Sequence, residues 1–284
     1  MPGNPQFIAS LSGAAGRGAA ALLEACAREL AARRGVDAPG AARAVAADPE
    51  LSRLLAAGAP PRELAARLAA LAAEPRCLGC GSCCRVSSPT LYLEDLPRLE
   101  AARLGWEALF TLRAGERVFS ARLGQSQVLP HELLKLREKK GACAQLTRRG
   151  CGIYGQRPLQ CRWLECWSGR HAGQLEDRPR LGRAQVLAGD PTALALANEY
   201  DAKVPAGRLH AALEGAARGE EAASREALTL LELDHRLRAG ISAHYGYAAE
   251  VLPLILGRPA LEVAANYGLG VAVEKGRPAL RRLA

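Results

Sequence analysis

The sequence predicts a mainly α-helical protein, with helical N- and C-terminal regions around a central, cysteine-rich and largely irregular metal-binding module that contains a short hairpin. Eight of the nine cysteines lie between positions 77 and 166, more than packing alone would require. Apolar residues on both sides of this cluster recur at helical spacing. Hydrophobic residues make up 49% of the chain and aromatic residues only 4%, so aliphatic side chains must fill the core. We expect three regions: residues 1–75, 76–182 and 183–284.

The N-terminal region is expected to be a small helical region behind a loose leading segment. Residues 1–18 are rich in Gly, Ser and Pro and show little periodicity. Residues 19–34 place apolar side chains on one face and are followed by Gly35, a typical helix end. Cys26 falls on that apolar face, where a thiol packs as a small hydrophobic group. We therefore expect a buried structural cysteine there rather than a ninth metal ligand.

Prolines and glycines mark further elements along the chain. The Asp-Pro pair at 48–49 and the Pro-Pro pair at 60–61 each predict the start of a helix. Residues 91–105 are expected to form a helix and residues 116–123 a strand. Residues 219–240 predict a long helix that ends at its final glycine.

Residues 143–154 predict a hairpin with its turn at residues 147–150, between two short apolar arms. A hairpin with this turn would bring Cys143 and Cys151 close together.

The net charge of +9 is concentrated in the cysteine-rich segment. Residues 76–180 carry 18 Lys and Arg against 10 Asp and Glu. Such a surplus could bind the phosphates of a nucleic acid. Thiolates gathered around a metal ion also leave negative charge that requires cationic neighbours. We favour the second explanation because the excess follows the cysteines, and nucleic acid remains the less favoured partner.

The N-terminal residues show no positively charged stretch leading into an apolar segment, and no apolar run of 18 or more residues follows. We therefore expect a cytoplasmic protein without a membrane partner. In that reducing compartment, clustered cysteines more often hold a metal than form disulfides.

The first cysteine motif, residues 77–84, has the pattern C-x2-C-x2-C-C. Its two-residue spacers let a tight turn direct successive sulfurs at one metal, and Gly79 and Gly81 supply permissive backbone. The neighbours Cys83 and Cys84 would point apart in extended backbone, which favours a second site for one of them.

The identity of the metal stays open between zinc and an iron-sulfur cluster. The motif resembles the opening of the bacterial ferredoxin pattern but lacks its C-P ending, so a cluster would need a distant cysteine. Eight thiolates also suffice for two four-thiolate zinc sites. The candidate ligands are the eight clustered cysteines: Cys77, Cys80, Cys83, Cys84, Cys143, Cys151, Cys161 and Cys166.

A second motif, Cys-Gly-Ile-Tyr-Gly-Gln-Arg-Pro-Leu-Gln-Cys-Arg at residues 151–162, follows downstream. Together the motifs resemble the bacterial CxxCxxCC cysteine-cluster family, the YkgJ-type zinc- or iron-chelating domain, over about residues 76–168. The resemblance implies a metal domain more firmly than an activity. Members are described as metal-chelating or as iron-sulfur oxidoreductases, and flagellin lysine methylases carry a related motif associated with an iron-sulfur cluster.

Three side chains of the second motif are expected to lie beside the metal or cluster. Arg157 and Arg162 place permanent positive charge near the sulfurs and could offset thiolate charge. Tyr154 is expected to pack over the site and to satisfy its hydroxyl locally. Trp163 and Trp167 are expected to cover the site against water and oxygen.

The sequence supports several functions and leaves enzymatic activity undecided. The first is metal binding by the cysteine module, with a protein partner on the helical regions. The alternatives are an iron-sulfur enzyme in redox or protein-modification chemistry, a zinc-stapled nucleic-acid or protein interaction module, and metal storage or delivery. Nucleotide-binding, serine-hydrolase and zinc-protease motifs are absent from the sequence.

Overall fold

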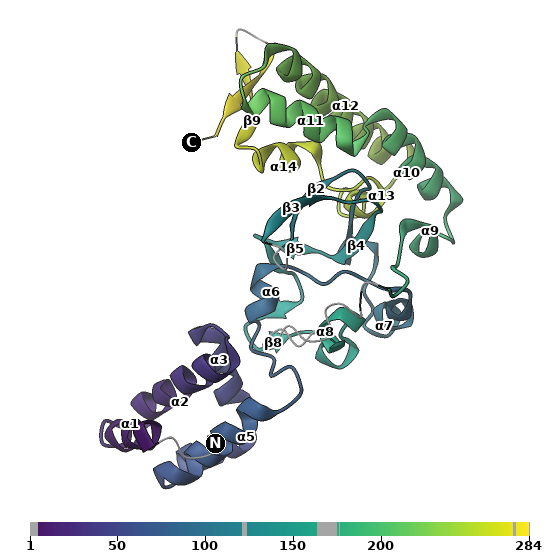
Figure 1. The fold of residues 1–284 in the computed structure, drawn as a ribbon. Helices are drawn as coiled ribbons and strands as arrows, with labels where there is room; N and C mark the ends of the chain where they lie inside the picture. Colours follow the sequence, from purple (N-terminus) through teal and green to yellow (C-terminus); the bar gives the residue numbers. More distant parts are fainter. Residues whose placement is uncertain (1–4, 121–123, 164–174, 176, 275–276, 284) are drawn as a thin grey trace. The chain divides into compact units, whose positions relative to one another are not determined.

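The protein is mainly helical, with short antiparallel strand pairs in the middle and near the C-terminus (Figure 1). The predicted fold class is therefore confirmed. The computed structural model describes residues 5–120, 124–163, 175, 177–274 and 277–283. Each helix among these residues is too short or too polar to cross a bilayer.

The chain forms two compact units. The first, here called the cysteine unit, comprises residues 1–89 and 138–178, and the second, the C-terminal unit, comprises residues 90–137 and 179–284. The segment between the two cysteine motifs therefore packs with the C-terminal helices. These units cut across the three predicted regions, whose boundaries stay a prediction.

Five helices open the cysteine unit and lie side by side (Figure 1). They are α1 (Pro5–Ala15), α2 (Ala19–Arg34), α3 (Ala38–Ala47), α4 (Pro49–Ala56) and α5 (Pro61–Ala73). The predicted helix at residues 19–34 is confirmed, and Gly35 ends it in the left-handed conformation with φ 59°. The predicted starts at Pro49 and Pro61 are also confirmed.

The loose leading segment that we expected at residues 1–18 is wrong, because residues 5–15 form α1. Phe7 and Leu11 are buried against the other helices, and this packing outweighs the poor helix propensity of the glycine and serine residues. Cys26 is fully buried in the same core, as predicted. Burial raises the pKa of its thiol to about 11, so it is a structural residue.

The rest of the cysteine unit consists of short elements. They are α6 (Ser82–Val86), β5 (Glu138–Lys139), β6 (Ala142–Cys143), β7 (Leu146–Thr147), β8 (Gly150–Cys151), a 3-10 turn η3 (Tyr154–Gln156) and α8 (Leu159–Trp163). The predicted hairpin is confirmed, because β7 pairs with β8 in antiparallel register, Thr147 opposite Gly150. The Thr147 hydroxyl donates to the Gly150 carbonyl at 2.8 Å and closes the turn.

The C-terminal unit combines three strand pairs with a helical region. Its first segment holds η1 (Leu93–Asp95), α7 (Leu96–Ala101), η2 (Trp106–Ala108), β1 (Leu109–Leu112), β2 (Arg117–Ser120), β3 (Gln125–Val128) and β4 (Leu133–Leu136). β1 pairs with β4 and β2 with β3, both antiparallel. Of the strand predicted at residues 116–123, residues 117–120 form β2, and residues 121–123 lie outside the described residues. The helix predicted at residues 91–105 covers only η1 and α7.

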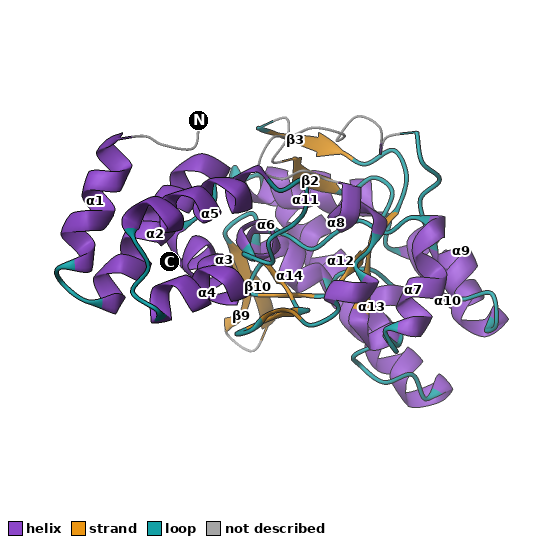
Figure 2. Ribbon diagram, turned by 90° about the horizontal axis from the view of Figure 1, so that it is seen from below, coloured by secondary structure: helices purple, strands orange, loops and turns teal. Residues whose placement is uncertain are grey.

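The second segment of this unit holds α9 (Arg183–Val186), α10 (Pro191–Lys203), α11 (Ala206–Ala217), α12 (Glu221–Tyr245), α13 (Leu252–Ile255), α14 (Ala260–Ala265), β9 (Leu269–Glu274) and β10 (Arg277–Arg282). The predicted end of α12 at Gly240 is wrong, because an interior glycine costs only about 1 kcal/mol and the helix continues to a left-handed cap at Gly246. The hairpin of β9 and β10, which lies beside α14 (Figure 2), was not predicted.

A buried ionic network holds the two segments of the C-terminal unit together. The Arg183 guanidinium donates to Glu132 at 2.7 Å and to the Ile255 carbonyl at 2.8 Å, and it also pairs with Asp201. Asp201 in turn pairs with the buried Arg113. Because each buried charge has a partner, the network fixes how these elements meet.

Candidate metal centre

Cysteines from both sequence motifs lie close enough to influence one another. Burial raises the pKa of Cys161 well above its usual range, and the nearby thiols of Cys83 and Cys143 raise it further. Burial likewise raises the pKa of Cys151, with Cys77 adding to the effect and Arg157 opposing it. Thiols that repel one another's charge in this way occupy one neighbourhood.

We call the set of mutually influencing thiols the thiol cluster. Its members lie on the first motif loop, α6, β6, β8 and α8, and are Cys77, Cys83, Cys84, Cys143, Cys151 and Cys161. Cys143 lies on β6, Cys151 on β8 of the hairpin and Cys161 on α8, and Cys143 and Cys151 lie near each other.

Cys83 and Cys84 lie side by side on α6, with their sulfur atoms 4.0 Å apart. We expected them to point apart because extended backbone turns neighbouring side chains by about 180°. A helix turns them by only about 100°, which is why both sulfurs remain on the same side of the chain. Cys83 is exposed, and the contact with Cys83, followed by burial, raises the pKa of Cys84.

The backbone around Cys77 is arranged to support a thiolate. The Gly79 amide donates to the Cys77 sulfur at 3.3 Å. Gly79 and Gly81 adopt left-handed conformations, with φ of 69° and 78°, that turn the loop tightly. Amide hydrogen bonds of this kind stabilise thiolate charge and tune a bound metal.

Tyr154 joins the two motifs. Its hydroxyl donates to the carbonyl of Cys77. The Arg157 guanidinium stacks on the Tyr154 ring at 3.7 Å, and its Nε donates to the Tyr154 carbonyl at 2.8 Å. This arrangement holds positive charge near Cys151. Arg162, the other arginine of the motif, is exposed on α8.

Cys80 lies apart from this arrangement. Its side chain is only 6% exposed and belongs to the hydrophobic core of the N-terminal helices. Its sulfur lies 3.5 Å from the Ser82 hydroxyl. The ligand role predicted for Cys80 therefore stays a prediction, and so does that of Cys166, which lies outside the described residues together with Trp167.

The donor set of the thiol cluster fits a soft metal centre. Thiolates are the preferred ligands of zinc and of iron-sulfur clusters, and six are present where four complete a site. Among the described residues, no three cysteine, histidine or acidic side chains already surround a common point as metal ligands would. Any of the six could serve as ligands, and bound metal would displace the protons that the raised pKa values favour.

Sequence reasoning missed the acidic and basic residues that hold the motif loops. Glu138 accepts hydrogen bonds from the Ser88 amide at 2.8 Å and the Ser88 hydroxyl at 3.0 Å, and thus ties the end of α6 to β5. Asp37 and Arg43 bind the first motif from the N-terminal helices. The Asp37-Ala-Pro start of α3 signals a helix cap, but no local pattern shows its distant partners.

A comparison with known proteins places the central segment in a family. No curated protein and no solved structure shows a detectable match to the chain. Residues 76–180 match the model of the CxxCxxCC family, which is described as a putative zinc- or iron-chelating domain. The matched range includes all eight clustered cysteines and begins after the N-terminal helices. The match over residues 76–180 bears out the resemblance to the CxxCxxCC family that the sequence motifs predict.

Proposed function

We propose that the protein binds zinc or an iron-sulfur cluster through cysteines of the thiol cluster. The observation that carries this proposal is the gathering of six thiols from five separate chain segments, with raised pKa values where they are buried. Without a counter-charge, the proximity of these thiols gives the folded protein no stabilisation. A bound cation, in contrast, stabilises all of them as thiolates.

The surrounding residues assist binding in defined ways. The Gly79 amide donates to the Cys77 sulfur, Arg157 supplies positive charge beside Cys151, and Tyr154 holds the two motifs together. Bound zinc would cross-link these segments, and a bound iron-sulfur cluster would add the capacity for electron transfer.

The experiment is anaerobic purification followed by elemental analysis and visible absorption spectroscopy. Near-stoichiometric zinc in a colourless protein would identify a zinc centre. Iron with acid-labile sulfide and visible absorption would identify a cluster. A freshly purified protein with neither metal, which also fails to bind either on reconstitution, would refute the proposal.

Two cysteine variants make the assignment specific. Cys161→Ala removes a half-buried member of the thiol cluster and should abolish stable metal binding. Cys26→Ala removes a buried thiol from the core of α1 to α5 and should leave the metal content unchanged. Equal loss in both variants would point to unfolding rather than to a lost ligand.

A further inference from the structure

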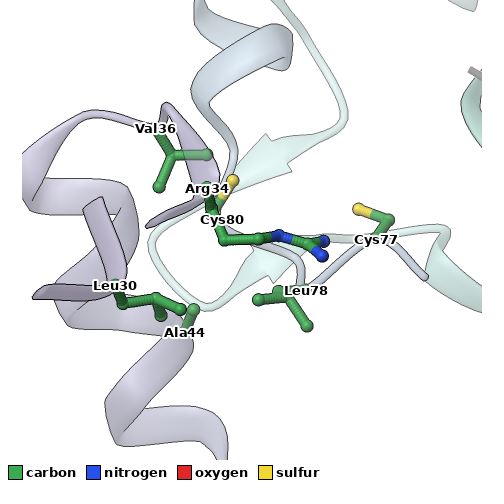
Figure 3. A pocket seen from close by; sticks show the side chains of 7 residues that line it. All are labelled: Leu30, Arg34, Val36, Ala44, Cys77, Leu78 and Cys80. Atoms are coloured by element: carbon green, nitrogen blue, oxygen red, sulfur yellow. The ribbon is translucent and has the colours of Figure 1, made fainter. Parts of the chain in front are cut away.

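The first cysteine motif faces two environments. Cys77, Cys83 and Cys84 belong to the thiol cluster, whereas Cys80 is buried among the N-terminal helices. Figure 3 shows the side chains of Cys80 and Cys77 at a small, largely apolar cavity that Leu30, Arg34 and Ala44 also line. Leu78, two residues earlier, packs against the same core. The part of the motif that contains Leu78 and Cys80 therefore belongs to the hydrophobic core of the N-terminal helices.

Arg34, the last residue of α2, holds the chain that enters the motif (Figure 3). Its guanidinium donates to the carbonyls of Ala72 at 3.1 Å, Glu74 at 2.8 Å and Arg76 at 2.8 Å. Arg34 is only 3% exposed, so these carbonyls replace the water that a guanidinium normally binds. The backbone leading to Cys77 is therefore fixed against α2.

A second set of contacts joins α3 to the motif. Arg43 donates to the Cys80 carbonyl. The Asp37 carboxylate caps α3 through the Gly40 amide at 2.7 Å and also accepts from the Ser82 hydroxyl at 3.1 Å and from Arg85 Nε at 2.9 Å. Because Ser82 and Arg85 belong to α6, these bonds also hold the helix that carries Cys83 and Cys84.

The approach of α3 to the motif is so close that a glycine is required. A Cβ atom at Gly40 would lie 2.7 Å from the Ser82 hydroxyl and 2.9 Å from the Cys80 carbonyl. Both distances are shorter than real contacts allow. Helix α3 and the loop of the first motif are therefore in direct, close-packed contact.

From this division of the motif we propose that Cys80 is not a metal ligand but the anchor that docks the first motif onto α2 and α3, with Arg34, Asp37 and Arg43 as positioning residues. The proposal rests on the proposed function, since it assigns roles within the same site. It extends that site to residues 34–43, which lie before the segment matched by the family model.

The test compares Cys80→Val with Cys77→Val, using Co²⁺ as the spectroscopic probe. Valine is apolar and similar in size to cysteine, so it keeps an anchor but cannot bind metal. Cys80→Val should keep the wild-type stoichiometry of Co²⁺ and the intensity of thiolate-to-cobalt absorption, whereas Cys77→Val should lose most of both. Loss of the absorption in Cys80→Val, with an unchanged circular dichroism spectrum, would overturn the proposal.

Hydrogen–deuterium exchange of the metal-free protein tests the docking independently. Gly40→Val should speed exchange at residues 76–86 at least tenfold, because it separates α3 from the motif. Gly16→Val, at a glycine of the same unit whose Cβ would make only an ordinary contact, should leave exchange there unchanged. If the wild type binds no Co²⁺, the zinc alternative of the proposed function fails, and hydrogen–deuterium exchange alone tests whether the motif is docked on α3. Unchanged exchange in Gly40→Val would then overturn that docking.

Discussion

The hydroxyl of Tyr154 donates a hydrogen bond to the backbone carbonyl of Cys77, 77 residues earlier in the chain, and joins the two cysteine motifs. The same ring carries the stacked guanidinium of Arg157, 3.7 Å away. A single tyrosine therefore links the loop of the first motif to the charge that faces Cys151 in the second. In the second motif this tyrosine stands three residues after Cys151.

Tyr154→Phe should weaken metal binding while leaving the fold intact. The change removes one hydrogen bond between the motifs but keeps the ring on which Arg157 stacks. A bond of this kind contributes about 1 kcal/mol, which corresponds to roughly fivefold in affinity. Competition with a chromogenic chelator measures the affinity, and Tyr245→Phe, at an exposed tyrosine of the C-terminal unit, is the control. An affinity equal to that of wild type would show that the bond does not support the site.

Arg34→Met should destabilise the cysteine unit strongly. Methionine preserves much of the apolar stem but leaves three backbone carbonyls without their donor, so we expect the free energy of unfolding to fall by about 2 to 4 kcal/mol. Urea denaturation of the metal-free protein provides the measurement. Arg28→Met, at an exposed residue of the same helix that pairs only with Glu24, should cost less than about 0.5 kcal/mol. Similar losses in both variants would contradict the role of Arg34.

The bond between Asp37 and Arg85 should make the docking of the first motif dependent on pH. Hydrogen bonding to Arg85 holds the pKa of Asp37 below its usual range, despite the opposing effect of burial. A lowered pKa in the folded protein stabilises it above the usual Asp pKa of about 4, and this stabilisation is lost as the pH falls through the folded value. The stability advantage of wild type over Asp37→Asn should therefore be present at neutral pH and shrink on acidification. A difference that stays constant between pH 7 and pH 3 would contradict this coupling.

Removal of the metal should expose Cys83 to alkylation. Cys83 is exposed and lies on the short helix α6, so a bound metal would protect its sulfur from iodoacetamide. We expect slow modification of the metal-loaded protein and at least tenfold faster modification after treatment with a chelator, measured by mass spectrometry. Cys26, buried and with a raised pKa, should stay unmodified in both states. Equal rates at Cys83 before and after chelation would exclude it as a ligand.

The elements predicted correctly are those with a local physical cause. The helix at residues 19–34 follows from its apolar face and from Gly35, and the hairpin that carries Cys151 follows from its turn residues. The errors arise where packing outweighs propensity. Residues 5–15 form a helix because Phe7 and Leu11 pack into the core of the N-terminal helices. Helix α12 continues through Gly240 because the residues on both sides of that glycine keep the chain helical.

By itself, the sequence determined the helical class, the cysteine-rich module and its family, because periodicity, caps and motif spacing are properties of neighbouring residues. Only the tertiary structure showed that Cys80 is buried in the core of the N-terminal helices, since equal spacing in the chain does not reveal how deeply each sulfur is buried. It also assigned residues 90–137 to the C-terminal unit, through buried charges such as Arg183 whose partners lie far away in the sequence. Long-range contacts of this kind leave no local pattern, because each depends on which surfaces meet when the chain folds.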